Sequence, residues 1–413
     1  MSRIYTSEQV SRGHVDKICD QIADAIVTDC LAHDQDSRVA VECLIKNNTI
    51  IIAGEITSHH EPDYAKLVCQ VMNRIGIDKL GYERLEVKGM ISKQSADIAL
   101  GVDKGGAGDQ GIMFGYATNE TPEMLPIPFA VATRFIHHLE GLNCEMFKAD
   151  AKAQVSYDYE SGRITTFLCS VQHSENASPE DIRAIIEPLM ILTAAEYGLN
   201  TDFEKLINPT GRFVIGGSKA DCGVTGRKLA CDTYGGLGRI GGGALSGKDP
   251  SKVDRSAAYM ARKIARDIVR GGYADKCEVQ IGYAIGKAEP VSVMVETFGT
   301  GRVCNHLLQG YIRSNYDLTP KGIIEYLHLL KVDYNAVSSG GHFGKEWLPW
   351  EMDEEDAEYL YSNILFCHFL SFPTPGRRRT LTIETLPAKM SMTKQESLHY
   401  TPAPTIWSLQ IDM

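Results

Sequence analysis

A pair of β-rich segments joined by a short turn occurs three times in the chain, each time beside a long amphipathic helix. The pairs are 38–45 with 49–56, 154–160 with 164–173, and 278–285 with 291–298. They recur roughly 115–125 residues apart, with weak similarity between the copies. A hairpin alone cannot bury its apolar face and needs a helix or further strands to cover it. The repetition therefore predicts an α+β protein of three structurally related units packed together.

Local signals predict where the helices begin and end. Residues 16–34 carry isoleucine or cysteine at every fourth position, which is typical of an amphipathic helix. The helix of the second unit has the residues of a capped start, with an N-cap, a proline at the first helical position and an acid that returns to the cap: Ser178, Pro179 and Asp181. A helix over 251–270 is expected to stop at the glycine pair 271–272.

The composition excludes several classes of protein. A net charge of −11 argues against general binding to nucleic acid or anionic membranes. No apolar run approaches the ~20 residues of a membrane span, and the N-terminus lacks a signal-peptide core. The 11 cysteines have no CxxC spacing, which favours buried free thiols, such as Cys30, Cys169 and Cys304, over disulfides or zinc sites. We expect a cytoplasmic protein in which an anionic substrate meets a local group of basic residues.

Four segments combine glycine with charge beyond what packing requires: 13–17, 106–116, 208–228 and 241–256. The first, GHVDK, opens a helix, where free N–H groups attract anions, so His14 and Lys17 could bind phosphate. In the last, three glycines lead lysines and acids into a helix N-terminus, which suits a polyphosphate with Mg²⁺. Two structural alternatives stay open: a capped helix with a surface histidine, and a mobile connector at the second segment.

These segments and their surroundings offer cations and acids but no obvious covalent nucleophile. The basic candidates are His14, Lys152, Arg227, Lys228, Lys248 and Lys252, and the acidic ones are Asp16, Asp109, Asp221 and Asp254. The sequence has no GxSxG elbow, no P-loop pattern and no cysteine in an activating context. The set suits electrostatic stabilisation of a polyphosphate leaving group. It predicts a Mg²⁺-dependent enzyme that uses a nucleoside triphosphate.

Longer motifs carry a resemblance to a known family. GAGDQGIMFGYATNET and GGGALSGKDPSKVDRS resemble the two signature segments of the S-adenosylmethionine synthetase (methionine adenosyltransferase) family. SEQVSRGHVDKICDQIADAI, GEIT, KQSADI, DAKAQV, NPTGRFVIGG, DCGVTGRK and GHFG match the family in the same order. The resemblance implies the family's fold, three related α/β units in a pseudo-threefold arrangement. The implied domains are N-terminal 1–98, central 99–230 and C-terminal 231–352, followed by an extra tail, 353–413.

The resemblance also implies a reaction: ATP, L-methionine and water give S-adenosylmethionine, phosphate and diphosphate. The methionine sulfur attacks C5′ of ATP and expels tripolyphosphate, which is then hydrolysed. Family members use a pair of Mg²⁺ ions and an activating K⁺, and form homodimers with active sites between the subunits; dimers usually pair into tetramers. The alternatives are a catalytically silent nucleotide-binding homologue or assembly subunit, and another ATP-dependent enzyme such as a kinase or ligase.

Matched motif by motif, the resemblance implies roles for individual residues. The expected catalytic residues are His14, Asp109, Lys152, Arg227, Lys248 and Lys252. ATP is expected to contact His14, Asp150, Lys152, Arg212, Phe213, Asp221, Arg227, Lys228, Ala244 and Lys248. Methionine is expected at Glu55, Gln94, Asp221 and Lys252, with Asp221 facing its ammonium group. Asp16 and Asp254 are expected to serve Mg²⁺, and Glu42 to serve K⁺.

The chain departs from the family pattern in four places. Val15 stands where the family has a proline, which removes a conformational restraint but no catalytic atom. Leu245 replaces a phenylalanine and is expected to change the packing beside the site. Segment 101–105, expected to belong to a mobile gate, is several residues shorter than in bacterial relatives. The residues after Glu351 have no counterpart in the family pattern.

Overall fold

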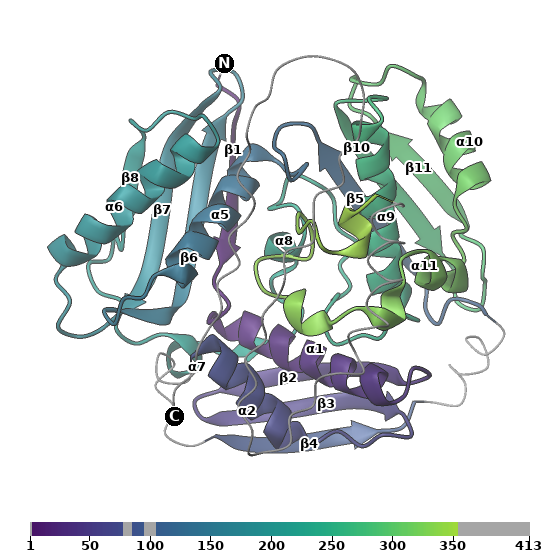
Figure 1. Ribbon diagram of the computed structural model, residues 1–413, viewed down its shortest axis with the longest axis horizontal. Coiled ribbons are helices and arrows are strands. Elements are labelled where there is room, and N and C mark those ends of the chain that lie inside the picture. Colours follow the sequence, from purple (N-terminus) through teal and green to yellow (C-terminus); the bar gives the residue numbers. More distant parts are fainter. Residues whose placement is uncertain (1, 77–84, 95–104, 354–413) are drawn as a thin grey trace, which may run out of the picture. The chain divides into compact units, whose positions relative to one another are not determined.

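The computed structural model describes residues 2–76, 85–94 and 105–353, all within one compact unit. Three sheets, each covered by helices, surround the short helix α8 (Leu229–Asp232), as Figure 1 shows. The prediction of an α+β protein with three related units is confirmed. The expected gate at 101–104 and the tail from 354 onward lie outside the described residues. Within the described ranges, no helix has both the length and the apolar character of a membrane span.

The first sheet contains the predicted hairpin of residues 38–56, which turns at Asn47 with φ 51°. Its order is β4-β3-β2-β9, and α1 and α2 pack against one face. The bounds are α1 (Val15–His33), β2 (Arg38–Lys46), β3 (Thr49–Thr57), α2 (Tyr64–Ile75), β4 (Glu86–Ser92) and β9 (Gly223–Val224). Val39, Val41 and Cys43 alternate along β2 and are buried beneath the helices, as a half-buried strand requires.

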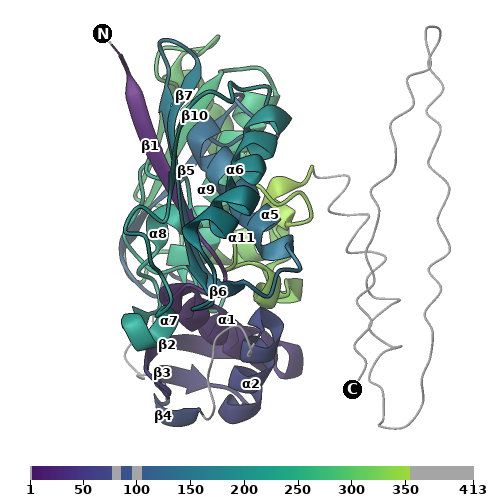
Figure 2. The ribbon, with the colours of Figure 1, turned by 90° about the vertical axis from the view of Figure 1, so that its left-hand side faces the viewer.

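The second sheet has the order β1-β6-β7-β8, with α5 and α6 on the same side of it (Figure 2). The bounds are β1 (Ile4–Val10), α5 (Ile127–Gly141), β6 (Phe147–Asp158), β7 (Arg163–His173), α6 (Pro179–Glu196) and β8 (Glu204–Ile207). The predicted capping box is confirmed. The Ser178 hydroxyl accepts from the Asp181 N–H, and the Asp181 carboxylate accepts from the N–H of Ser178.

The third sheet, β11-β10-β5, packs against α9, which the structure ends at Gly271 close to the predicted position. The bounds are β5 (Gly111–Thr118), α9 (Val253–Arg270), β10 (Lys276–Tyr283), β11 (Ser292–Glu296), α10 (Asn305–Asn315) and α11 (Pro320–Tyr326). The remaining short elements are α7 (Gly217–Ala220), η1 (Leu329–Lys331), η2 (Tyr334–Ala336) and η3 (Pro349–Glu351). The hairpin predicted between 278 and 298 is therefore confirmed as β10 and β11.

Each sheet completes its hairpin with a strand from a distant part of the chain. β1, at the N-terminus, pairs with β6 in the second sheet. β5 pairs with β10 in the third sheet, and β9 pairs with β2 in the first. These pairings bring strands that are distant in the sequence into one sheet.

The interior is apolar, with several buried ion pairs between the sheets. Two hydrophobic clusters form the core: one joins the first and third sheets with α1 and α9, and the other lies between the second sheet, α5 and α6. Most described cysteines are free thiols in or near this core. The prediction of burial is wrong for Cys304, which is exposed directly before α10, and Cys69 is exposed as well.

Candidate active site

The N-terminus of α1 holds a buried histidine. His14 is the N-cap, and its Nδ1 accepts the N–H of Asp16 at 3.2 Å. Nδ1 therefore carries no proton, and the imidazole has its hydrogen on Nε2, free to donate. The side chain is only 3 % exposed, so the alternative of a surface histidine is wrong.

The surroundings keep His14 neutral. Burial and then the charges of Lys228 and Lys152 lower the pKa of His14 to about 3, against smaller opposite effects of Asp16 and Asp221. His14 and Asp16, 3.9 Å apart, are consequently not an ion pair at neutral pH. The neutral ring can give its Nε2 hydrogen to an anion without adding to the positive charge of the lysines.

We expect the His14 imidazole of the ligand-free protein to show no titration in NMR spectra between pH 5.5 and 8. The reason is that its pKa lies at about 3 in the folded chain but near the ordinary 6.5 in the unfolded chain. The unfolded chain therefore binds more protons between these values, and His14 makes folding less favourable as pH falls through that window. The His14→Gln variant identifies the signal, and a midpoint between pH 6 and 7 would contradict the expectation.

Acids and lysines from three elements lie around His14. Asp16 Oδ2 pairs with Lys228 Nζ at 2.5 Å, and its Oδ1 accepts the N–H of Val224 at 2.9 Å. Burial alone would raise the pKa of Asp16, but Lys228 and the Val224 amide bring it below its usual value. Lys152 projects from β6, close enough for its charge to act on His14 and on Asp150.

Asp150, also on β6, has one oxygen without a partner. Its Oδ2 accepts the N–H of Gly217 at 2.8 Å, whereas the buried Oδ1 has no hydrogen bond within the described structure. Burial raises the pKa of Asp150 despite the opposing Gly217 amide and Lys152 charge. A buried oxygen of this kind needs a donor or a cation. Asp221 is exposed nearby, and its charge acts on both His14 and Asp150.

A second charged group marks the N-terminus of α9. Lys248 forms an ion pair with Asp254, which lies in the first turn of that helix. Gly243 approaches Asp254 so closely that a Cβ on Gly243 would lie 2.5 Å from the carboxylate, so a side chain there would displace the carboxylate from its present position. Asp254 and Leu245 both line a pocket with the start of β5 and the three glycines 241–243. Leu245 therefore lies in the same pocket as the charged group.

Three aspartates on one face of α1 bind the backbone of two glycine-rich loops, 208–228 and 241–256. Asp16, Asp20 and Asp24 are spaced by four residues and so lie one turn apart along one face of α1. Their Oδ1 atoms accept the N–H groups of Val224 at 2.9 Å, Gly226 at 2.8 Å and Gly247 at 3.0 Å, in that order. We call these three residues the aspartate row. Asp24 also pairs with Arg255 at 2.5 Å, with both side chains fully buried.

The backbone of β2 also binds the two loops. It pairs with β9 and, through Ala40, with Lys248. Ala40 also lies opposite Glu55 on β3, so Lys248, Ala40 and Glu55 form one cross-strand row on one face of the sheet. Residues far apart in the sequence thus meet where the first sheet joins the two loops.

Other predicted site residues lie outside the charged groups at the N-termini of α1 and α9. Lys252 pairs with Asp249 at 2.5 Å, Arg212 pairs with Glu175 at 2.8 Å on the surface, and Arg227 donates to the Cys222 carbonyl at 3.3 Å. The Phe213 N–H donates to His173 Nε2 at 3.0 Å, the exposed Asp109 accepts the Gln110 N–H, and the Gln94 N–H donates to the Thr57 hydroxyl. Ala244 faces Gly226, and Glu42 is exposed on β2.

One interpretation of the GHVDK motif is wrong. Lys17 is 1 % exposed and donates to both Asp20 and Asp232, so it stabilises buried acids and does not face a phosphate. The sequence analysis also missed Asp20, Asp24 and Arg255. The signal that could have found the two acids is the four-residue spacing of Asp16, Asp20 and Asp24 within one helix.

Comparisons with known proteins place the chain in one family. Three domain profiles match consecutive parts of the chain: "S-adenosylmethionine synthetase, N-terminal domain" over 2–96, "central domain" over 104–213, and "C-terminal domain" over 215–352. The chain is also similar to an S-adenosylmethionine synthase of Mesoplasma florum. The two are 46 % identical over 367 residues, which cover 85 % of this chain and 97 % of that protein.

Proposed function

This chain belongs to the S-adenosylmethionine synthetase family and is a methionine adenosyltransferase, and we propose how its residues perform the reaction. The methionine sulfur forms a bond to C5′ of ATP while the C5′–O bond breaks, and tripolyphosphate leaves with the bonding electron pair. Water then cleaves the tripolyphosphate into phosphate and diphosphate. Because sulfur is a good nucleophile without a base, the enzyme must chiefly stabilise the departing anion.

The observation that carries the proposal is the cationic group around the neutral His14. Lys152 and Lys228 offer positive charge, and His14 offers an Nε2–H donor at the N-terminus of α1. Lys248 offers a further charge beside α9. Donors fixed before the reaction cost little reorganisation as negative charge grows on the leaving oxygen. We assign His14, Lys152, Lys228 and Lys248 to the phosphates, with Asp150, Arg212, Phe213, Asp221, Arg227 and Ala244 completing the ATP site.

The carboxylates present fit Mg²⁺. Mg²⁺ prefers oxygen ligands and commonly binds one or two carboxylates together with substrate phosphates. Asp16 and Asp254 each present a carboxylate now paired with a lysine, and the buried Asp150 Oδ1 has no partner among the residues that the structure describes. We propose that Asp16 and Asp254 hold a pair of Mg²⁺ ions, which neutralise phosphate charge when bound. Glu42, exposed on β2, is proposed to serve K⁺.

Methionine is proposed to bind beside the first sheet. Glu55 lies on β3 in the cross-strand row with Lys248, and Gln94 is tethered to the end of β3 through Thr57. The exposed carboxylate of Asp221 suits the methionine ammonium group, and Lys252 its carboxylate. Asp109, just before β5, is proposed to face the substrates as well.

The direct test is incubation of the protein with ATP, L-methionine, Mg²⁺ and K⁺. S-adenosylmethionine, phosphate and diphosphate are expected in equal amounts. ATP binding without any of these products, in a correctly folded protein, would favour a silent homologue. Transfer of phosphate or adenylate to another acceptor would favour a kinase or ligase. We propose that the enzyme acts in the cytoplasm.

A second copy of this chain is the proposed partner of the first sheet. The face of that sheet away from α1 and α2 carries Leu44 at 37 % exposure and Met90 at 69 %, with Ile51 and Ala53 between them. Exposed apolar side chains gathered on one face favour association. Glu42 and Glu55 share this face, so a homodimer formed there would bring site residues to the interface. Pairing of dimers into tetramers is proposed from the family.

We expect the double variant Leu44→Asp/Met90→Asp to dissociate the homodimer. Each carboxylate buried without a partner costs several kcal/mol, so the dissociation constant should rise at least ~100-fold. Light scattering after size exclusion, at several concentrations, measures the change. Leu192→Asp on α6, where the leucine is 52 % exposed, is the matched control and should leave the assembly intact. An unchanged dimer in the double variant would place the interface elsewhere.

A further inference from the structure

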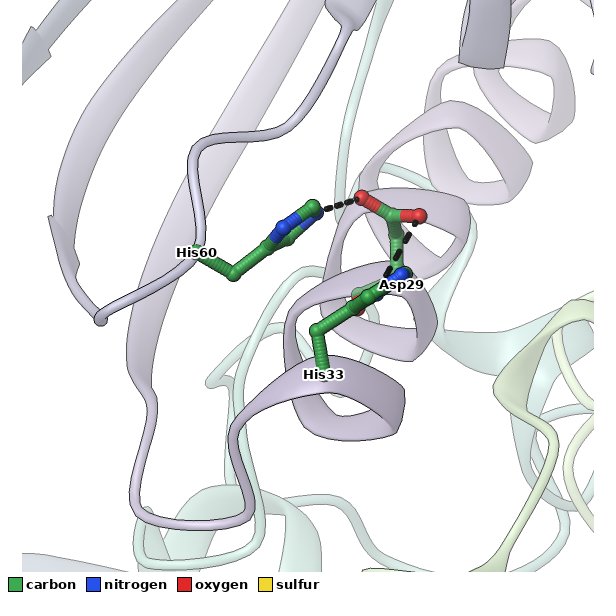
Figure 3. A group of neighbouring side chains, drawn as sticks. All are labelled: Asp29, His33 and His60. Atoms are coloured by element: carbon green, nitrogen blue, oxygen red, sulfur yellow. Dashed lines mark hydrogen bonds and ion pairs between the residues drawn. The ribbon is translucent and has the colours of Figure 1, made fainter.

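Two histidines and an aspartate gather at the C-terminal end of α1 (Figure 3). Asp29 and His33 lie one turn apart on the helix, and His60 projects from the segment between β3 and α2. His60 Nε2 lies 2.7 Å from Asp29 Oδ2. The two imidazole rings are stacked, with centroids 4.0 Å apart and planes 10° apart. One ligand atom of each residue lies within 4.8 Å of the other two.

The residue types and spacing are those of a transition-metal site. Imidazole nitrogen and carboxylate oxygen are ligands of Zn²⁺, at about 2.0–2.2 Å from the ion. Two ligands at positions i and i+4 of a helix point to the same side, as in helical zinc sites. Four-coordinate ligands lie roughly 3.3 Å apart at such bond lengths. Because the stacked rings lie in nearly parallel planes, the His60 ring must turn before both imidazoles can face one ion, and its partial exposure leaves room for that turn.

The tautomer of His33 fits a ligand. Its Nδ1 lies 2.8 Å from the Asp29 carbonyl oxygen, an acceptor that places the ring hydrogen on Nδ1. The lone pair of Nε2 is then available. Histidines that bind metals usually donate their other N–H to a carbonyl or a carboxylate in this way, which orients the ring before the ion binds.

The segment that carries His60 is held against the end of α1. Asp34, the C-cap of α1, accepts the N–H of His59 at 2.8 Å and the hydroxyl of Ser58 at 3.3 Å. The same hydroxyl oxygen of Ser58 accepts the His60 N–H at 3.0 Å. These bonds fix the loop without using the three candidate ligands. The ligands are therefore positioned by contacts that would persist when an ion replaces the proton shared by His60 and Asp29.

We propose that Asp29, His33 and His60 bind a divalent transition cation of the Zn²⁺ class, with solvent at the fourth position. The site is not catalytic, because Asp29 is 13 residues from Asp16 along α1, roughly 20 Å at 1.5 Å per residue. It joins the end of α1 to the segment after β3 and so stabilises that part of the fold. Mg²⁺ and K⁺ prefer all-oxygen sites and bind there weakly.

The test uses tag-free full-length protein freed of metal by a chelator and titrated calorimetrically with Zn²⁺ in Mg²⁺ buffer. The double variant Cys69→Ser/Cys304→Ser is used throughout. Among the cysteines that the structure describes, these two are exposed, and their thiols could bind Zn²⁺. One Zn²⁺ per chain and a rise in melting temperature on adding Zn²⁺ are expected. Co²⁺ in the same site should give the visible absorption of a four-coordinate ion.

His33→Gln and His60→Gln are each expected to weaken Zn²⁺ binding at least ~100-fold, because each removes a ligand. His59→Gln is the matched control: it changes the neighbouring, exposed histidine, and binding should be unchanged. If either ligand variant fails to fold, Asp29→Asn provides the same comparison. Absence of a Zn²⁺ site in the parent protein would overturn the proposal. So would Zn²⁺ affinity that survives loss of the histidines.

Discussion

Replacing Lys248 by alanine is expected to lower kcat at least ~100-fold while the protein stays folded. Lys248 is the cation beside Asp254 at the start of α9, where we place the departing tripolyphosphate. Its charge matters most as the C5′–O bond breaks, so the loss should fall on kcat more than on KM. The side chain is 22 % exposed, and the pairing of residue 248 with Ala40 on β2 uses backbone atoms, so the fold should survive.

Asp254→Ala is expected to have an effect of the same size, because Asp254 is proposed to serve Mg²⁺. Steady-state kinetics with saturating ATP, methionine, Mg²⁺ and K⁺ measure both variants. Lys321→Ala is the matched control, since Lys321 is 80 % exposed on α11 and pairs with Glu325 on the surface. Near-normal turnover in the Lys248 or Asp254 variant would show that the residue has been assigned the wrong role.

The second large effect is expected from Asp24→Asn, which should lower the unfolding free energy by about 3–5 kcal/mol. Asparagine keeps the size of the side chain but leaves the fully buried Arg255 without its counter-charge. Arg255 has few alternatives: it also donates to the Lys248 carbonyl at 2.9 Å and lies 4.4 Å from the Tyr334 ring centre. The melting temperature should fall by roughly 5 °C.

Two comparisons make this expectation specific. Asp202→Asn breaks a pair with Arg163 in which both side chains are exposed, and should leave the melting temperature nearly unchanged. The double variant Asp24→Asn/Arg255→Met removes both buried charges, keeps an acceptor for the Gly247 N–H, and should recover much of the loss. A melting temperature of Asp24→Asn equal to that of Asp202→Asn would show that the buried pair does not stabilise the fold.

The parts of the fold that local sequence signals specify were predictable. The hairpins follow from alternating apolar residues, and the start of α6 follows from Ser178, Pro179 and Asp181. The pairing of distant strands could not be predicted. β1 pairs with β6 across about 150 residues of chain, and no local pattern encodes that partner.

In the candidate site, too, local motifs could be predicted from the sequence and contacts between distant parts of the chain could not. Motifs identified Asp16, Lys228 and Lys248, whose charges lie near glycines. The interpretation of Lys17 was wrong because its partner Asp232 comes from α8, far along the chain. Nor did the pattern reveal that α1 is buried on nearly all sides over its first turns, so that its acids contact amides instead of water.

The aspartate row also limits how such an enzyme can diverge. Its members accept backbone N–H groups, so side chains in the two loops can change without loss of these bonds. Insertion of one residue between Asp16 and Asp24 would instead turn the later acids by about 100° around the helix axis, away from their amides. Loop positions other than the tightly packed Gly226 and Gly247 can thus change where the length of the helix cannot. Variants with altered substrate preference are best sought at the loop side chains, with the length of α1 kept constant.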